Sequence, residues 1–284
     1  MNITTTPEET MANATLTSWD ISISIIPKVT GMLSLMGSAL IIHDGIRILR
    51  RTLNGLVPST YHRILVSMSA FDIISSMCNF LSTWPSPRGT PGAFQAVGTQ
   101  GTCTAQGFFS EVGNITVVLY NAMLCVYQVL SIRNRWKEYY LSNIQWVFHV
   151  IPILVGLTMG IMGLVFSIFG PAQHMCWFVT DPPGGLFRTI HFGIIWSAIT
   201  YVSVGMLLIY WDVRTEDRAM EKFRYRRNVD MTPEELRKKR KAERRSGNAW
   251  KVAERAGLFV VAMYLTWTFP TVSYNCSTRL VPSY

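Results

Sequence analysis

The sequence predicts an all-α membrane protein, a bundle of helices that cross the bilayer six times with the N-terminus outside. Three observations carry this prediction. Charged residues make up only 15% of the 284 residues although the formal net charge is +9, and an ordinary soluble domain has roughly 25% charged residues. Apolar runs near the ~20 residues that a bilayer-spanning helix needs recur along the chain. The basic residues gather between these runs, on one side of the membrane.

Six apolar runs are long enough to cross the bilayer, and we expect each to form a helix. They lie at residues 21–42, 64–84, 102–132, 144–169, 187–211 and 256–274. The third run is more polar than the others, and Pro27 interrupts the first near its start. A polar tail, residues 1–20, precedes the first run, and a short outer segment, 276–284, follows the last. Because the tail has no basic stretch followed by an apolar core, we do not expect a cleaved signal peptide.

The basic residues orient the chain in the membrane. With the N-terminus outside, the three inner connections carry 22 of the 26 lysines and arginines, which is the positive-inside bias of membrane proteins. The N-x-Thr sequons at Asn2 and Asn13 then lie in the outer tail, where we expect glycosylation. A third sequon, at Asn114, lies inside a span and should stay unmodified.

The longest inner connection, residues 212–255, is strongly basic, with 15 lysines and arginines. Within it, Thr232 and Glu235 have the spacing of a capping box and Pro233 stands in the first turn, so a helix is expected to begin there. Two interpretations stay open: a helix that anchors on anionic lipid, or a docking surface for a cytosolic partner. The flanking spans argue against a nuclear or nucleic-acid role for its KKRK cluster.

Two cysteines face the outer, oxidising side of the membrane. Cys103 begins the third span, and Cys176 lies in the outer loop after the fourth. We expect a disulfide that ties this loop to the third helix, the alternative being two free thiols. Cys78 and Cys125 lie inside spans, where we expect them to act as small packing residues.

Cysteines in these two places look like those of a G-protein-coupled receptor, and four stretches sharpen the likeness. They are "IPKVTGMLSLMGSALIIHDGIRILR" (26–50), "STYHRILVSMSAFDIISS" (59–76), "TCTAQGFFSEVGNITVVLYNAMLCVYQVLSIRNRW" (102–136) and "CWF" (176–178). The first three resemble the first three helices of cyclic-AMP-receptor-like (class E) receptors and related receptor-like proteins of protists and algae, and the fourth fits their second outer loop. The resemblance covers about residues 20–275. It implies a seven-helix, GPCR-like bundle that senses an outer ligand and engages a heterotrimeric G protein inside.

The sequence departs from rhodopsin-like receptors in two places. The third span lacks their acidic–Arg–aromatic triplet, and Arg133 and Arg135 are the nearest basic residues. The resemblance implies that these arginines and Trp136 face the G protein. In the sixth span, Trp267 and Pro270 stand one residue further apart than the rhodopsin-like Trp-x-Pro, and we expect them to form the hinge of activation.

Asp72 lies about nine residues into the second span, or ~13 Å along a helix. An ionisable side chain at this depth should face the bundle interior. The resemblance implies a polar network coupled to activation, in which we include Asn79 and, from the third span, Asn121 and Gln128. The alternative is a neutral, hydrogen-bonded structural aspartate.

The third span carries a stripe of polar side chains on one helical face. Glu111, Asn114, Asn121 and Gln128 follow one another at intervals of three and seven residues, so they share a face that must look inward. Gln106, Glu111 and Asn114 lie toward the outer mouth and are candidates for ligand contact. The two deeper residues are expected to hydrogen-bond between helices.

The fifth span carries three polar side chains that could line a ligand pocket: His191, Ser197 and Tyr201. Of these, we predict that Tyr201 contacts the ligand. His191 has a second interpretation, because a histidine near the end of a span is more often interfacial.

These observations favour a signalling receptor, with the lipid bilayer, a heterotrimeric G protein and an unknown small extracellular ligand as partners. A six-span transporter or channel is the alternative, although no span carries the regularly spaced arginines of a voltage sensor and no inverted repeat is found. A retinal protein is not supported, because no lysine lies mid-span. We expect no enzyme activity, cofactor, metal or nucleic-acid partner, since phosphate-loop, metal-ligand and nucleophile motifs are missing.

The chain ends after the sixth span, where a seventh should begin. We therefore keep two further expectations: either a seventh helix follows in a longer protein, or the chain is a six-span, non-signalling receptor paralogue.

Overall fold

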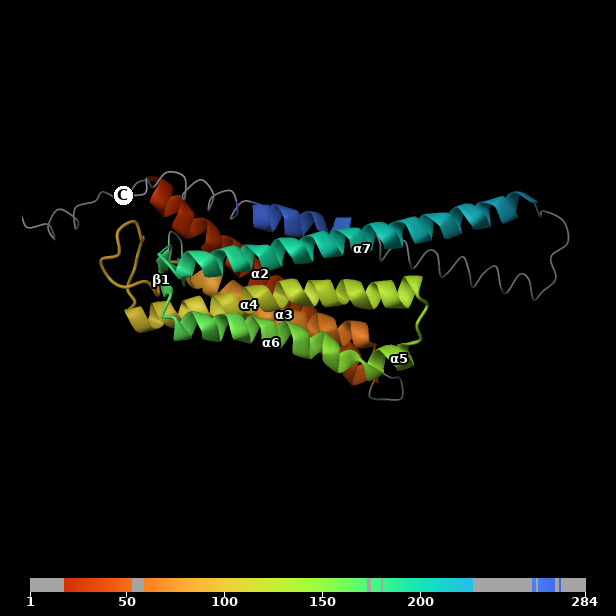
Figure 1. Ribbon diagram of the computed structural model, residues 1–284, viewed down its shortest axis with the longest axis horizontal. Helices are drawn as coiled ribbons and strands as arrows, with labels where there is room; N and C mark the ends of the chain where they lie inside the picture. Colours follow the sequence, from red (N-terminus) through yellow and green to blue (C-terminus); the bar gives the residue numbers. More distant parts are fainter. Residues whose placement is uncertain are drawn as a thin grey trace, which may run out of the picture. The chain divides into compact units, whose positions relative to one another are not determined.

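The computed structural model describes residues 18–52, 59–172, 175–179, 181–226, 257–258, 260–268 and 271. Most of them are helical (Figure 1). The chain divides into two compact units. The first combines residues 1–120 with 142–195, and the second combines 121–141 with 196–284.

The helices follow the predicted apolar runs in order. They are α2 (Ser18–Thr52), α3 (Thr60–Leu81), α4 (Gln100–Gln128), the short α5 (Glu138–Asn143), α6 (Gln145–Val165) and α7 (Gly184–Arg226). A single π-helical turn, η1 (Val129–Arg133), continues α4. Within the described residues, five helices are long and apolar enough to cross a membrane: α2, α3, α4 with η1, α6 and α7. The predicted all-α membrane bundle is therefore confirmed.

Several predicted boundaries differ from those of the helices. α2 runs to Thr52 rather than ending at residue 42, because helix formation depends on backbone propensity and continues past the apolar stretch. α6 ends at Val165, since the residues up to 169 turn and begin a strand instead. Of the predicted sixth span, residues 257–258, 260–268 and 271 are helical, and the remainder lies outside the described residues.

Glycines bring the helices of the first unit close together. A Cβ atom on Gly31 of α2 would stand 2.6 Å from the backbone nitrogen of Phe80 in α3, so the two helices meet backbone to backbone there. Gly113 of α4 lies in the same way against Ser75 of α3, and Gly156 of α6 lies against Thr116 of α4. Small residues allow this close packing, which is the main source of helix association in lipid.

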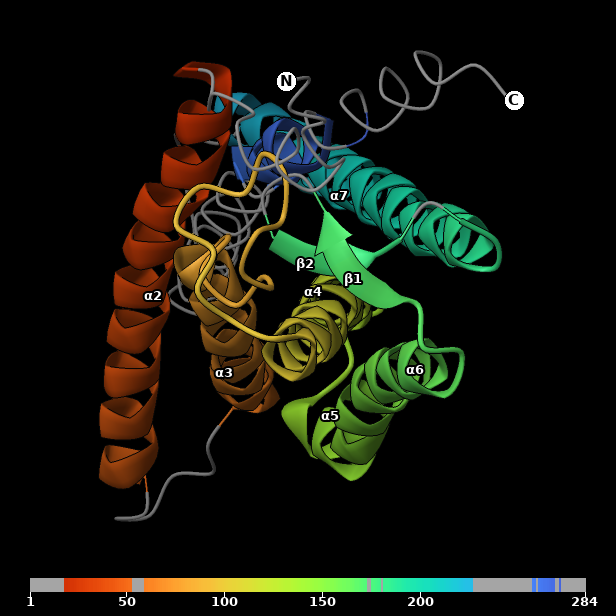
Figure 2. The ribbon, with the colours of Figure 1, turned by 90° about the vertical axis from the view of Figure 1, so that its left-hand side faces the viewer.

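Two short antiparallel strands form a hairpin against the N-terminal half of α4 (Figure 2). They are β1 (Phe169–Ala172) and β2 (Met175–Phe178). Phe169 and Phe178 are paired across the hairpin, with their rings stacked at 5.2 Å between centroids. Together with Met159, Ile168 and Phe187, they form a buried apolar cluster. Through this cluster the hairpin packs against α6 and the start of α7.

The second unit contains the C-terminal part of α4, η1 and most of α7. Tyr264 and Thr271 contact Trp196 of α7: the ring centroids of Tyr264 and Trp196 are 6.0 Å apart, and the Trp196 indole donates a 3.3 Å hydrogen bond to Thr271. Cys125 of α4 lies against Gly205 of α7. Both Cys125 and Cys78 are buried free thiols, in agreement with their predicted packing role.

Candidate functional site

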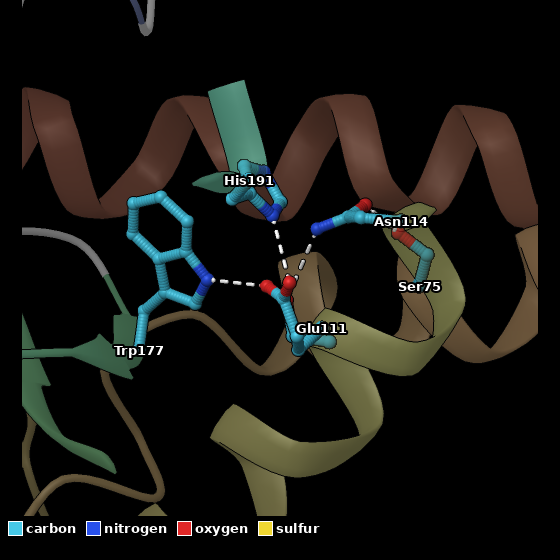
Figure 3. A network of polar contacts seen from close by, with 6 residues as sticks. Ser75, Glu111, Asn114, Trp177 and His191 are labelled. Carbon is cyan, nitrogen blue, oxygen red and sulfur yellow. Dashed lines mark hydrogen bonds and ion pairs between the residues drawn. The ribbon is translucent and has the colours of Figure 1, made fainter. Parts of the chain in front are cut away.

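A fully buried carboxylate is the centre of the candidate site (Figure 3). Glu111 of α4 has no solvent exposure. One of its oxygens accepts a 2.9 Å hydrogen bond from the indole nitrogen of Trp177 in β2. The other lies 2.9 Å from Nδ1 of His191 in α7, which is itself 1% exposed. One side chain of α4 therefore joins the hairpin and α7.

The disulfide brings Trp177 to Glu111. The predicted bond between Cys103 and Cys176 is present and ties β2 to the first turn of α4. The residue after Cys176 is Trp177, so the disulfide holds the Trp177 indole close to the surface of α4. The ring of Trp177 also packs edge-on against that of His191, with centroids 4.8 Å apart. Sequence reasoning missed Trp177, although its position next to a cysteine of the outer loop was the available signal.

Arg188 is the second residue that the sequence did not point to. Its guanidinium lies over the Trp177 ring, 5.2 Å from the centroid. Its Nε donates a 2.8 Å hydrogen bond to the carbonyl oxygen of Phe178. Arg188 stands one turn before His191 on α7. It therefore places a positive charge beside Trp177, the residue whose indole donates a hydrogen bond to Glu111.

Gln106 holds the hairpin in place. Its amide nitrogen donates to the carbonyl oxygens of Cys78, at 3.0 Å, and Ser82, at 2.7 Å. Its amide oxygen accepts a 2.9 Å hydrogen bond from the backbone nitrogen of Cys176. Gln106 is 4% exposed and its polar atoms bond to the protein's own backbone, so its ligand contact stays a prediction and its role in this structure is to hold the hairpin.

Asn114 forms a second polar group next to Glu111 (Figure 3). Its amide oxygen accepts a hydrogen bond from the hydroxyl of Ser75 in α3, and its nitrogen lies 3.3 Å from the hydroxyl of Ser110. Glu111 and Asn114 thus face inward, as the polar stripe predicted. Their partners are side chains of α3, α4, α7 and the hairpin.

The predicted pocket residue Tyr201 does not join this group. Its side chain is 49% exposed. Ten residues separate it from His191, and at ~100° per residue this turns it roughly 80° away from the face that His191 occupies. Of the two interpretations of His191, the structure supports the inward-facing one.

Asp72 is held by hydroxyl groups of the first helix. Ser34 donates a 2.9 Å hydrogen bond to its carboxylate, and Ser38 donates a shorter one to the same oxygen. Ser76, one turn later in α3, lies at 3.4 Å. Asp72 therefore bonds to α2 and to its own helix, because α2 and α3 pack closely, which the composition of α3 alone does not reveal. The wider polar network with Asn79, Asn121 and Gln128 stays a prediction.

Asn121 and Gln128 are buried in the part of α4 that belongs to the second unit. Burial agrees with an inward-facing stripe. Trp267 is half-buried, whereas its predicted hinge partner Pro270 lies outside the described residues, as do the sequons at Asn2 and Asn13.

A cleft of about 300 Å³ lies in the second unit, at the end of α4 that the charge pattern predicts to be cytosolic. Its lining residues come from η1, the turn after it and α7: Ile132, Arg133, Arg135, Asp212, Val213 and Thr215. Arg133 and Asp212 form an ion pair with 3.5 Å between Nε and Oδ2. Asp212, which sequence reasoning did not single out, thus pairs with one of the two predicted arginines, and both arginines line one cleft.

Trp136 follows this turn and is 43% exposed, and its backbone nitrogen donates a 3.0 Å hydrogen bond to the carbonyl of Leu130. The hydrogen bond from Asn134 to the carbonyl of Val129 spans five residues, as in a π-helix, a rare element found often at functional sites. The turn therefore supplies two arginines to the cleft, and an exposed tryptophan follows them in the chain.

The long apolar helices and the disulfide-tethered hairpin define a membrane-spanning helical bundle with a G-protein-coupled-receptor-like fold. The comparison with solved structures agrees: the chain is similar to a crystal structure of squid rhodopsin, with a TM-score of 0.61 over 92% of this chain and 70% of that chain. The two are 13% identical, so the likeness establishes the fold. No protein-family model and no curated protein matches the chain.

Proposed function

We propose that the chain is a transmembrane receptor that senses a small extracellular ligand and signals to a heterotrimeric G protein. The observation that carries the proposal is the inner cleft, in which Arg133 and Arg135 stand together within a GPCR-like fold. Arginine suits this role, because its planar guanidinium binds carboxylates and carbonyl groups of a partner through several hydrogen bonds.

Trp136 supports the same assignment. It is a large, exposed side chain directly after the two arginines, at the predicted cytosolic end of α4. Tryptophan and arginine are the side chains most often found at the centre of protein interfaces. A partner segment seated in the cleft would contact both arginines, and Trp136 follows them directly in the chain.

On the outer side, we propose that the ligand acts through the hairpin and Glu111. The hairpin is joined to α4 by the disulfide and to both α4 and α7 by the Glu111 contacts. The continuation of α4 in η1 supplies Arg133, and α7 supplies Asp212, to the same cleft. A ligand that displaces the hairpin would therefore act on the two helices that form the partner site.

The finer assignments are also proposals. We infer a kinship with cyclic-AMP-receptor-like receptors from the three quoted stretches at 26–50, 59–76 and 102–136. We further propose a plasma-membrane location, an N-glycosylated outer tail and no catalytic activity.

The test is retention of a G protein by the purified full chain in lipid nanodiscs. A panel of heterotrimers with different α subunits is added, and nucleotide is removed with apyrase, since a receptor holds its G protein most tightly in the nucleotide-free state. We expect at least one heterotrimer to be retained, and Arg133→Glu to weaken retention about tenfold, equivalent to ~1.4 kcal/mol.

Arg88→Glu is the matched control, because Arg88 lies in the predicted outer loop and should leave retention unchanged. Failure of the wild-type chain to retain any member of the panel would overturn the proposed coupling. A solute flux in vesicles that carry the chain would favour the transporter alternative instead.

A further inference from the structure

We propose that the segment from Lys137 to Tyr140 binds the headgroups of anionic phospholipids, at a surface next to the arginine cleft and separate from it. The proposal does not depend on G-protein coupling. Lys137 is exposed, and Tyr139 and Tyr140 are 70% and 57% exposed. The residues of this turn that line the cleft end at Arg135. The segment therefore offers one ammonium group and two phenol rings outside the partner site.

Contacts on the other side of the segment fix which side chains face outward. Leu141 is fully buried. The carboxylate of Glu138, the only acidic residue of this inner connection, accepts a 3.0 Å hydrogen bond from the hydroxyl of Tyr127 in α4. The rings of Tyr139 and Tyr140 contact each other edge-on, with 5.6 Å between their centroids. The acid is thus tied to the bundle, while the aromatic pair and the lysine are exposed.

The segment lies at the level where a membrane-spanning helix leaves the bilayer. It directly follows α4 and η1, which together are long and apolar enough to cross a membrane. The ion pair between Arg133 and Asp212 places α7 at the same level. Next to Asp212, α7 carries Trp211, which is 62% exposed, and the exposed Arg214. Because tryptophan and tyrosine gather at membrane–water interfaces, these side chains mark a headgroup level on both helices.

The charge of the segment decides which lipid it favours. The ammonium group of Lys137 attracts a phosphate, and the hydroxyls of Tyr139 and Tyr140 are hydrogen-bond donors that suit the same oxygens. A zwitterionic headgroup has no net charge, because its own ammonium group offsets the phosphate. An anionic headgroup keeps a net negative charge, which attracts basic residues near the membrane surface. The segment should therefore hold anionic lipid in preference to zwitterionic lipid.

The experiment uses the purified full chain in phosphatidylcholine nanodiscs that contain a trace of one lipid with a photoactivatable headgroup, either phosphatidylserine or phosphatidylcholine. After illumination, mass spectrometry counts the lipid adducts on residues 133–143. In the wild-type chain we expect about fivefold more adducts with phosphatidylserine, equivalent to ~1 kcal/mol, which is the attraction between one basic residue and an anionic surface. Lys137→Gln should remove this excess, and Lys137→Arg, which keeps the charge, should retain it.

Arg88→Gln is the matched control for charge, because Arg88 is an exposed basic residue of the predicted outer loop, and it should keep the full excess. Tyr139→Phe combined with Tyr140→Phe keeps both rings and removes their hydroxyl donors, so adducts with both lipids should fall. Tyr201→Phe, at an exposed tyrosine of α7, should change neither. Equal adducts with the two lipids in the wild-type chain, or an excess that survives Lys137→Gln, would overturn the proposal.

A second measurement needs no variant. The excess of phosphatidylserine adducts on the wild-type chain should fall as the salt concentration rises from about 0.05 M to about 0.5 M, because salt screens interactions between exposed charges. An excess that is independent of salt would contradict the proposal.

A protein partner is the other occupant that an exposed aromatic pair beside a lysine suits, and the same experiments distinguish it. A protein contact would give no excess of phosphatidylserine adducts, while Lys137→Gln would weaken retention of the G protein. That pair of results would assign the surface to the partner site and overturn the lipid proposal.

Discussion

Gln106 illustrates how a single side chain in a membrane bundle can serve the scaffold. Its amide hydrogen-bonds to two segments that are distant in sequence, the end of α3 and the second strand of the hairpin. A buried polar group without a partner costs free energy because no water replaces the lost hydrogen bond. The same residue type at the mouth of a helix could have contacted a ligand, and only the positions of Ser82 and Cys176 decide between the two roles.

Gln106→Leu tests this role. The substitution keeps the size of the side chain but leaves the Ser82 carbonyl and the Cys176 amide without this partner. We expect a loss of about 1–3 kcal/mol in the free energy of unfolding, measured by denaturant titration in detergent. Gln95→Leu is the control: Gln95 is exposed with a single side-chain hydrogen bond from Trp84, and its replacement should stay within ~0.5 kcal/mol. Equal effects of the two substitutions would contradict the scaffold role.

At the scale of the elements, close helix contacts determine which polar groups meet. α4 approaches α3 at Gly113, and this approach allows Asn114 to accept the hydrogen bond from Ser75. α2 approaches α3 at Gly31, and the hydroxyls of Ser34 and Ser38 reach Asp72 from the same helix. In both cases a glycine contact lies beside a polar contact, so helix packing and hydrogen bonding are satisfied together.

Gly113→Ala should therefore destabilise the bundle. An added Cβ would stand 2.9 Å from Cβ of Ser75 and 3.0 Å from its backbone nitrogen, so α3 and α4 must move apart. Overpacking of this kind costs about 1–3 kcal/mol. Gly37→Ala in α2 is the matched control, since nothing lies within 4 Å of its added Cβ. A lower unfolding temperature for Gly113→Ala than for Gly37→Ala is the expected result, and the reverse order would show that the α3–α4 contact is looser than described.

At the scale of the whole molecule, the charge distribution predicts how the chain lies in the bilayer. Lysines and arginines are concentrated in the three connections assigned to the inside, and the energy of retaining them on the cytosolic side orients membrane proteins. Because this orientation depends only on the order of spans and charges, we predict that the Glu111 site lies on the outer side and the Arg133 cleft on the inner side.

Glycosylation tests this orientation. In eukaryotic cells the wild-type chain should lose apparent mass after endoglycosidase treatment, because the sequons at Asn2 and Asn13 would lie outside. The segment after the sixth predicted span also contains an Asn-Cys-Ser sequon at Asn275. Combined Asn2→Gln, Asn13→Gln and Asn275→Gln substitution should abolish the change in gel mobility, while the sequon at Asn114, inside a helix, contributes none. A mobility change that persists in the triple variant, or its absence in the wild-type chain, would argue against the predicted orientation.

The sequence by itself determined the membrane class and the order of the helices, and it predicted the disulfide between Cys103 and Cys176 that the structure contains. Each of these depends on hydropathy, charge or compartment, which are properties of short segments. It also indicated that Glu111 and Asn114 face inward, since a polar stripe in a membrane helix has no favourable alternative.

Only the tertiary structure decided which partners these residues meet. Trp177 and His191 reach Glu111 from a hairpin and a helix that lie 66 and 80 residues further along the chain. Asp72 accepts hydrogen bonds from serines of α2, and Gln106 hydrogen-bonds to backbone groups of α3, of the residue that follows it and of the hairpin. The physical reason is that such contacts depend on how closely helices approach and on their rotation about their axes. Both are set by the packing of all the helices of a unit at once, and no single segment encodes them.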